Sequence, residues 1–109
     1  MAIGKRQKNR LHKWWTDHAA READAMIAKL DEYGTGDLYE IGAQLAKLNG
    51  RDVTQQQAYE LGVMFYLIGK MQRVITAAHL ERTASDDTWH DIAVYAKMVL
   101  AARQKAMPQ

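Results

Sequence analysis

The sequence predicts an all-α fold, a four-helix bundle, from three observations. Apolar residues recur at alternating spacings of three and four over almost the whole chain, which is typical of amphipathic helices. No segment alternates apolar and polar residues with the period of two that is typical of strands, and the single proline, Pro108, lies near the end of the chain. Three polar segments, "YGTGD", "NG" and "ERTASDD", divide the chain into four helical stretches.

The first two helices are separated by "YGTGD". A long helix is expected over residues 7–33, because apolar residues fall on one side of it and Gly34 and Gly36 then break it. Asp37 or Thr35 is expected to cap a shorter helix, "LYEIGAQLAKL", which ends at the "NG" of residues 49 and 50.

The third helix is the most apolar of the four. Thr54 and Gln57 form the pattern of a capping box, so the helix is expected to begin there and to run to about residue 80. Its middle, "LGVMFYLIGKMQRVI", is apolar nearly all round, which predicts a central helix that the others surround. Gly62 and Gly69 are expected to let a neighbouring helix approach closely. Any apolar surface that the chain leaves uncovered would build a homo-oligomer.

The fourth helix is expected to begin at a cap formed by Ser85 or Asp86 and to run to about residue 105. Its predicted inward side is an apolar stripe of Trp89, Ile92, Ala93, Ala96, Val99 and Leu100. At 109 residues the four helices form one domain, near the size at which small proteins gain stability by oligomerising.

The composition excludes several classes of protein. Without cysteine there is no disulfide framework and no thiolate site, so a metal would be held by oxygen or imidazole ligands. The first residues are too polar for a signal peptide, and no apolar run approaches the roughly 20 residues of a membrane span. We therefore expect a cytoplasmic protein that is not inserted in a membrane.

Positive charge is concentrated at the start of the chain. Residues 1–15 hold five cations and no acid, whereas the rest of the chain holds 10 basic and 13 acidic side chains. We therefore distinguish a basic N-terminal arm, residues 1–15 at the start of the first helix, from a single all-α domain, residues 16–109. The arm could contact nucleic-acid phosphates and stack a base, or could simply be solvated. The arm residues concerned are Lys5, Arg6, Lys8, Arg10, Lys13 and Trp14.

Two cations and two acids fall on the helices on either side of "ERTASDD". Lys70 and Arg73 share a side of the third helix, whereas Asp87, Asp91 and Tyr95 follow at four-residue spacing on the fourth. A carboxylate beside a core must be paired with a cation, share a metal or take part in chemistry, because burying an isolated charge is costly. One interpretation is an ion pair of Arg73 with Asp91 or Asp87 that ties the two helices together. The other is a ligand site.

Three motifs extend this second interpretation. "YGTGDLYEIG", "GKMQRV" and "DDTWHDIAVYA" follow one another over about residues 31–100. In this order they resemble the small phage-borne families related to MazG nucleotide pyrophosphohydrolases. The resemblance implies an all-α protein, usually a dimer or a tetramer, that releases pyrophosphate from nucleoside triphosphates. It also implies magnesium held by acids on two neighbouring helices.

The resemblance also implies roles for individual residues. Asp91 matches the final aspartate of the last helix, but Thr88 stands three residues before it where the families have a glutamate, and Asp87 lies one residue further away. The helix after "YGTG" offers Asp37 and Glu40. The implied magnesium ligands are therefore Glu40, Asp37, Asp87 and Asp91, with Glu40, Asp87 and Asp91 as the catalytic acids. The implied nucleotide contacts are Lys70, Arg73 and Tyr95.

Two functions from different classes remain open. The first is binding of a nucleotide or a nucleotide-derived ligand, with or without magnesium-dependent hydrolysis to a monophosphate and pyrophosphate, because the missing glutamate weakens the case for turnover. The second is a non-enzymatic phage protein that binds nucleic acid through the basic arm or a host protein through its helical surface. In that case the charged residues of the third and fourth helices only hold the helices together.

Overall fold

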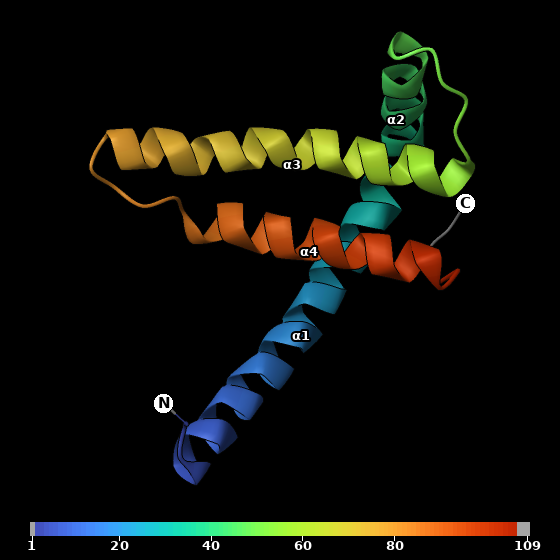
Figure 1. Ribbon diagram of the computed structural model, residues 1–109. Coiled ribbons are helices and arrows are strands. Elements are labelled where there is room, and N and C mark those ends of the chain that lie inside the picture. Colours follow the sequence, from blue (N-terminus) through green and yellow to red (C-terminus); the bar gives the residue numbers. More distant parts are fainter. Residues whose placement is uncertain (1, 107–109) are drawn as a thin grey trace.

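The computed structural model describes residues 2–106, apart from the side chain of Tyr33, so the last three residues of the predicted domain lie outside it. Within these residues the chain forms four α-helices and no strand, which confirms the all-α prediction. The helices are α1 (Lys5–Tyr33), α2 (Gly36–Leu48), α3 (Gln55–His79) and α4 (Asp86–Arg103) (Figure 1). The observed ends agree with the predicted ends to within about two residues, because several of them have a local signal.

Those local signals are visible in the backbone and in the caps. Gly34 ends α1 with a φ of 67°, a left-handed conformation that favours glycine. At the start of α3, the Gln57 amide donates to Thr54 Oγ1 at 3.1 Å and the Thr54 amide donates to Gln57 Oε1 at 2.9 Å, so the capping box is confirmed. Ser85, rather than Asp86, caps α4 by accepting the Thr88 amide at 3.3 Å.

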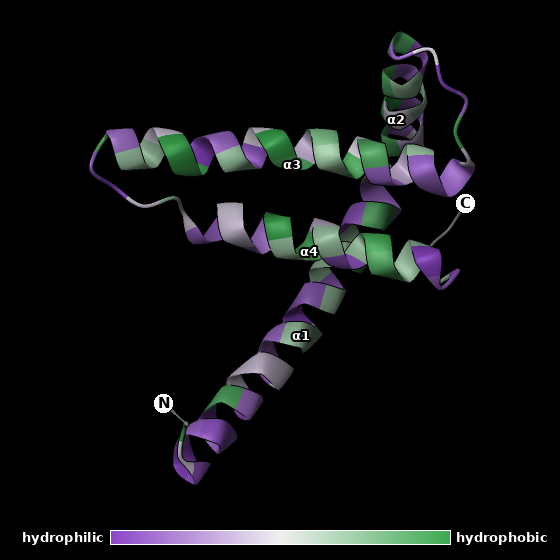
Figure 2. Ribbon diagram, viewed as in Figure 1, coloured by the Kyte–Doolittle hydropathy of each residue, from purple (hydrophilic) through white to green (hydrophobic). Residues whose placement is uncertain are grey.

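The helices form a bundle with one projecting arm. Figure 1 shows α3 and α4 running antiparallel, α2 crossing α3 near the start of α3, and α1 crossing α4 and extending well beyond it. The radius of gyration is 16.8 Å, whereas a compact domain of about 100 residues has roughly 13 Å. The first half of α1 therefore projects from the bundle, and Figure 2 shows that it is largely hydrophilic. None of the described helices is both long enough and apolar enough to cross a membrane.

The core lies where α3 and α4 meet. Tyr59 and Val63 from α3 pack with Val94, Met98 and Ala102 from α4, and residues of α1 and α2 close over them. The Tyr59 hydroxyl is buried and has no hydrogen-bond partner among the described residues, and burial raises its pKa to about 12. At one edge of this core, Arg103 of α4 donates to both carboxylate oxygens of Glu60 on α3, at 2.6 and 3.0 Å, and so ties the end of α4 to α3.

Two glycines let α2 and α3 approach closely. A Cβ added to Gly62 would overlap the carbonyl oxygen of Leu38, and a Cβ added to Gly42 would overlap that of Ala58. The predicted close approach at Gly62 is therefore confirmed. At Gly69 it is wrong, because no part of the described chain lies within 4 Å of the added Cβ.

Two predictions of inward faces were also wrong. On α4 the buried residues include Thr88, Val94 and Met98, whereas Trp89 and Leu100 of the predicted inward stripe are each 54% exposed. The reason is that α4 carries two apolar stripes on opposite sides, and periodicity alone does not tell which one meets the core. Nor is α3 surrounded, because α1 crosses α4 and leaves one side of α3 uncovered.

Candidate functional site

Asp91 of α4 holds two lysines from two other helices. Lys29 Nζ of α1 donates to Asp91 Oδ1 at 2.6 Å, and Lys70 Nζ of α3 lies 2.9 Å from Asp91 Oδ2. The side chains are largely buried, with exposed fractions of 19% for Asp91, 11% for Lys70 and 31% for Lys29. Two positive charges therefore share one negative charge in a partly desolvated place, which leaves a net positive charge there.

Two tyrosines cover the lysines. The rings of Tyr66 on α3 and Tyr95 on α4 lie against each other, with their centroids 4.2 Å apart. Lys70 Nζ lies 5.3 Å from the centre of the Tyr66 ring, and Lys29 Nζ lies 5.1 Å from the centre of the Tyr95 ring. We refer to Lys29, Tyr66, Lys70, Asp91 and Tyr95 as the lysine–tyrosine cluster.

Helical spacing explains how the cluster is built. Tyr66 and Lys70 are four residues apart on α3, and Asp91 and Tyr95 are four residues apart on α4, so each pair shares one side of its helix. Because α3 and α4 pack along each other, these sides meet, and Lys29 reaches them from the second half of α1. Three helices therefore contribute to one group of charges.

The ionisation of the cluster follows from these contacts. Burial acts to raise the pKa of Asp91, but the hydrogen bonds from Lys29 and Lys70 outweigh it and hold the pKa below the ordinary value of 3.8. The hydrogen bond to Asp91 raises the pKa of Lys70 above its ordinary value, against the opposing effect of burial. Burial, and then the interaction with Tyr66, raise the pKa of the Tyr95 hydroxyl. At neutral pH Lys70 is therefore an ammonium group, Asp91 is a carboxylate and Tyr95 is neutral.

These shifts predict a loss of stability in acid. A carboxyl group whose pKa is lower in the folded chain than in the unfolded chain stabilises the fold above its ordinary pKa, and that contribution disappears as the pH falls through the folded-state pKa. Asp91 and Glu60 both behave in this way, with ordinary values of 3.8 and 4.5. We expect the free energy of unfolding, measured by urea denaturation, to fall as the pH drops below 4.5. The decrease in the free energy of unfolding with falling pH should be shallower in Asp91→Asn than in the wild type. Equal slopes would contradict the ion pairs of Asp91 with Lys29 and Lys70.

A cavity of about 260 Å³ lies beside the cluster. It is bordered by Lys29, Tyr66 and Tyr95 of the cluster and by Asp37 in the first turn of α2. The lining therefore includes an ammonium group, two aromatic rings and a carboxylate.

The structure brings together some of the residues that the sequence singled out and separates others. Lys70, Asp91 and Tyr95 belong to the cluster, and Asp37 borders its cavity. Glu40 is exposed on α2. Asp87 is exposed and borders a different hollow between α1 and α4.

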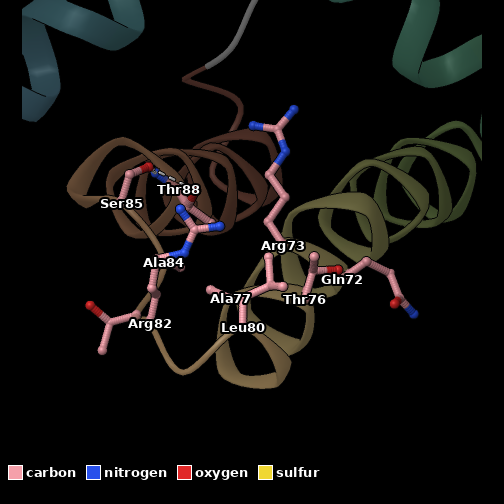
Figure 3. Close-up of a pocket in the computed structure, with 10 residues that line it drawn as sticks. Gln72, Arg73, Thr76, Ala77, Leu80, Arg82, Ala84, Ser85 and Thr88 are labelled. Carbon is pink, nitrogen blue, oxygen red and sulfur yellow. Dashed lines mark hydrogen bonds between the residues drawn. The ribbon is translucent and has the colours of Figure 1, made fainter.

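Arg73 does not take part in the cluster. The side chain is exposed and lines an open hollow of about 430 Å³ between the end of α3 and the loop that follows it (Figure 3). Within residues 2–106 Arg73 makes no ion pair, so the interpretation in which Arg73 pairs with Asp91 was wrong, and Lys29 and Lys70 take that place. The physical reason is that Lys70, three residues earlier, already faces α4 and reaches Asp91 first.

Sequence reasoning missed Lys29 and Tyr66. A signal exists for each of them. Lys29 lies three residues after Met26 and next to Leu30, so it falls within the apolar stripe of α1, and Tyr66 lies one turn before Lys70. A lysine within an apolar stripe needs a buried anion, which in this fold is Asp91.

The acids that the resemblance implies as magnesium ligands are not all grouped in this arrangement. Within the described part of the chain no group of three or more His, Asp or Glu side chains is placed to hold a metal ion. Both oxygens of Asp91 face lysines, which a metal ion would have to displace. Of the four acids that the resemblance implies as ligands, Asp91 belongs to the cluster and Asp37 borders its cavity, whereas Glu40 and Asp87 lie elsewhere.

Comparison of the chain with protein-family models, with curated proteins and with solved structures finds no match. The likeness to MazG-related families therefore rests on the sequence motifs, and the function is inferred from the site.

Proposed function

We propose that this protein binds a nucleotide or a nucleotide-derived ligand, with its phosphate at the lysine–tyrosine cluster. The observation that carries this proposal is the sharing of one carboxylate, Asp91, by two ammonium groups beside a pair of tyrosine rings. The surplus positive charge attracts an anion, and lysine is a common ligand of phosphate. Both rings also border the cavity, where they offer apolar surface to a base.

The geometry suggests how such a ligand would sit. Lys29 is the more exposed of the two lysines and borders the cavity, so it is the first phosphate contact, whereas Lys70 is more deeply buried and pairs with Asp91. The cavity of about 260 Å³ is slightly smaller than the roughly 300–1,000 Å³ of pockets that enclose drug-sized ligands. A nucleotide would therefore be enclosed in part, with the remainder in solvent. Asp37, which also borders the cavity, can accept hydrogen bonds from ribose hydroxyls.

The resemblance supports further parts of this proposal. We infer from the motifs a phage-borne, MazG-like protein that acts in the cytoplasm of the host cell as a homo-oligomer. Magnesium-dependent hydrolysis is the least supported part, because the acids are separated and Asp91 is engaged by lysines. Binding is therefore the proposed function, and hydrolysis is a separate question for experiment.

The proposal is tested by calorimetric titration of nucleoside mono-, di- and triphosphates, with and without magnesium. We expect binding that does not require magnesium, because lysines rather than a metal ion contact the phosphate. The same samples are assayed for released pyrophosphate, and magnesium-dependent release would show that the acids assemble in the complex. Absence of binding for every nucleotide would contradict the proposal and leave the cluster as a structural ion pair.

A second candidate function is favoured by the projecting half of α1. Its cations, Lys5, Arg6, Lys8, Arg10 and Lys13, are all exposed, and Trp14 and Trp15 beside them are 52% and 63% exposed. Such an arm suits a nucleic-acid backbone, with an indole for a base. Removal of residues 1–10 should then weaken binding to single-stranded DNA or RNA and flatten its dependence on salt, while nucleotide binding at the cluster is unchanged.

A further inference from the structure

A hollow of about 600 Å³ lies between the middle of α1 and the start of α4. We call it the α1–α4 hollow. Its volume is within the roughly 300–1,000 Å³ of pockets that bind small molecules. It is separate from the proposed nucleotide site, because none of the described residues that border it borders the cavity beside the lysine–tyrosine cluster. The side chains that line it include Trp14, His18 and Glu22 of α1 and Asp86, Asp87 and Trp89 of α4.

The α1–α4 hollow is negatively charged. Glu22, Asp86 and Asp87 contribute three carboxylates, and the described residues that border the hollow include no lysine and no arginine. None of the three makes an ion pair within residues 2–106. Asp86 and Asp87 lie in the first turn of α4, where the helix dipole stabilises a carboxylate. Glu22 lies in the middle of α1 and has no such compensation.

The described part of the chain leaves polar groups of α1 unsatisfied at this place. The Glu22 side chain is partly buried, and a carboxylate that is removed from water costs free energy unless a cation compensates it. One turn earlier on the same side of α1, the Nδ1 atom of His18 is buried and has no hydrogen-bond partner among the described residues. A ligand that is positively charged and donates hydrogen bonds supplies what both groups lack.

Two indole rings give the hollow a second chemical character. Trp14 is 52% exposed and Trp89 is 54% exposed. The His18 ring stacks on Trp14 with the ring centres 4.2 Å apart, which restricts the movement of that indole. The face of a tryptophan attracts a cation, and aromatic rings are the usual means by which proteins recognise organic ammonium groups. Carboxylates alone suit a hard metal ion, whereas carboxylates beside indoles suit an organic cation.

We propose that the α1–α4 hollow binds a small organic cation that carries two or more ammonium groups on an alkyl chain, as in a linear polyamine. One ammonium group pairs with Glu22 and lies against an indole face, and another pairs with Asp86 or Asp87. The alkyl carbons between them cover apolar surface of Trp14 and Trp89. Three carboxylates around one hollow favour several charges in one molecule, because a single ammonium group leaves two of them unpaired.

The first test is calorimetric titration with spermidine, a linear triamine, at an ionic strength of about 0.1 M. We expect one spermidine to bind per chain. Putrescine, a diamine, should bind several-fold more weakly, and n-butylamine more weakly again, because each ammonium group that is removed leaves a carboxylate unpaired. Magnesium chloride at the same concentration should not displace spermidine, since it gains nothing from the indoles.

The carboxylates are tested by Glu22→Gln, which keeps the shape of the side chain and removes its charge. Spermidine binding should weaken about tenfold, because one ion pair in a partly desolvated place is lost. Glu32→Gln is the matched control, since Glu32 is an exposed acid of the same helix that does not border the hollow. It should bind spermidine as the wild type does.

The indoles are tested by Trp89→Leu, which keeps an apolar side chain and removes the aromatic face. Spermidine binding should weaken about three- to fivefold, the usual size of a cation–aromatic interaction at an exposed site. Trp15→Leu is the control, because Trp15 is 63% exposed and does not border the hollow. All four variants replace exposed or partly exposed side chains and should keep the helical circular dichroism of the wild type.

Four outcomes would overturn the inference. Absence of spermidine binding to the wild type would leave the three carboxylates as solvated surface groups. Equal losses in Glu22→Gln and Glu32→Gln would show that the amine binds the acidic surface without a defined site. Displacement by magnesium, with Trp89→Leu unchanged, would make the hollow an acidic metal site. A trilysine peptide that binds more tightly than spermidine would make a basic protein segment the occupant.

Discussion

Gly62→Ala should lower the free energy of unfolding by about 3 kcal/mol. The added methyl group would overlap the carbonyl oxygen of Leu38, which belongs to the backbone of α2 and cannot turn away as a side chain can. Relief of the overlap requires α2 to move away from α3, and overpacking of this kind typically costs 1–3 kcal/mol, occasionally more. The measurement is urea denaturation at fixed protein concentration.

Gly69→Ala is the matched control for this prediction. Gly69 lies on the same helix, two turns further along, and no described residue from elsewhere in the fold comes within 4 Å of the added Cβ. Alanine favours a helix over glycine by ~1 kcal/mol, so this variant should be as stable as the wild type or more stable. Equal stability of Gly62→Ala and the wild type would contradict the close packing of α2 on α3.

Asp91→Asn should have two large effects of opposite sign. The first is a loss of about 2–4 kcal/mol in the free energy of unfolding, because the buried Lys70 and the partly buried Lys29 lose the anion that pairs them. The second is tighter binding of a nucleotide, by about tenfold, because the phosphate no longer competes with a carboxylate for the two ammonium groups. Asparagine keeps the shape of the side chain, so the site should not collapse.

The sign of the second effect separates two roles for Asp91. If Asp91 pairs the lysines, its replacement strengthens nucleotide binding. If Asp91 instead holds a metal ion that contacts the phosphate, its replacement weakens binding in magnesium and leaves binding without magnesium unchanged. Calorimetric titration of a nucleoside triphosphate in both conditions decides the matter, provided that circular dichroism shows the variant folded. Weaker binding in magnesium would contradict the arrangement of charges described here.

Local sequence signals sufficed for the helices. Gly34, the Thr54–Gln57 capping box and Ser85 set the ends of helices through contacts within a few residues, and all of them are seen. Which side of a helix is buried is a tertiary property. The spacing of apolar residues identified α3 and α4 as helices. Because both helices are apolar on two sides, the same spacing could not show which side packs within the chain.

The candidate site was predicted in part for the same reason. Helical spacing placed Asp91 and Tyr95 on one side of α4, and Lys70 on α3 proved to be their neighbour. Lys29 could not be assigned to the site from the sequence, because it lies 62 residues before Asp91 in the chain. It reaches Asp91 only because α1 crosses α4. The separation of Glu40 and Asp87 from the cluster likewise depends on how the helices cross, which motif spacing does not specify.

The most direct measurement combines removal of the phosphate from the ligand with removal of a lysine from the protein. Binding of a nucleoside and of its 5′-monophosphate is compared in the wild type, in Lys29→Ala and in Lys97→Ala, an exposed lysine of α4. If Lys29 contacts the phosphate, Lys29→Ala weakens binding of the nucleotide about tenfold or more and leaves binding of the nucleoside unchanged. Lys97→Ala then alters the binding of neither ligand. If Lys29→Ala weakens both ligands equally, or neither, the phosphate does not lie at the lysine–tyrosine cluster.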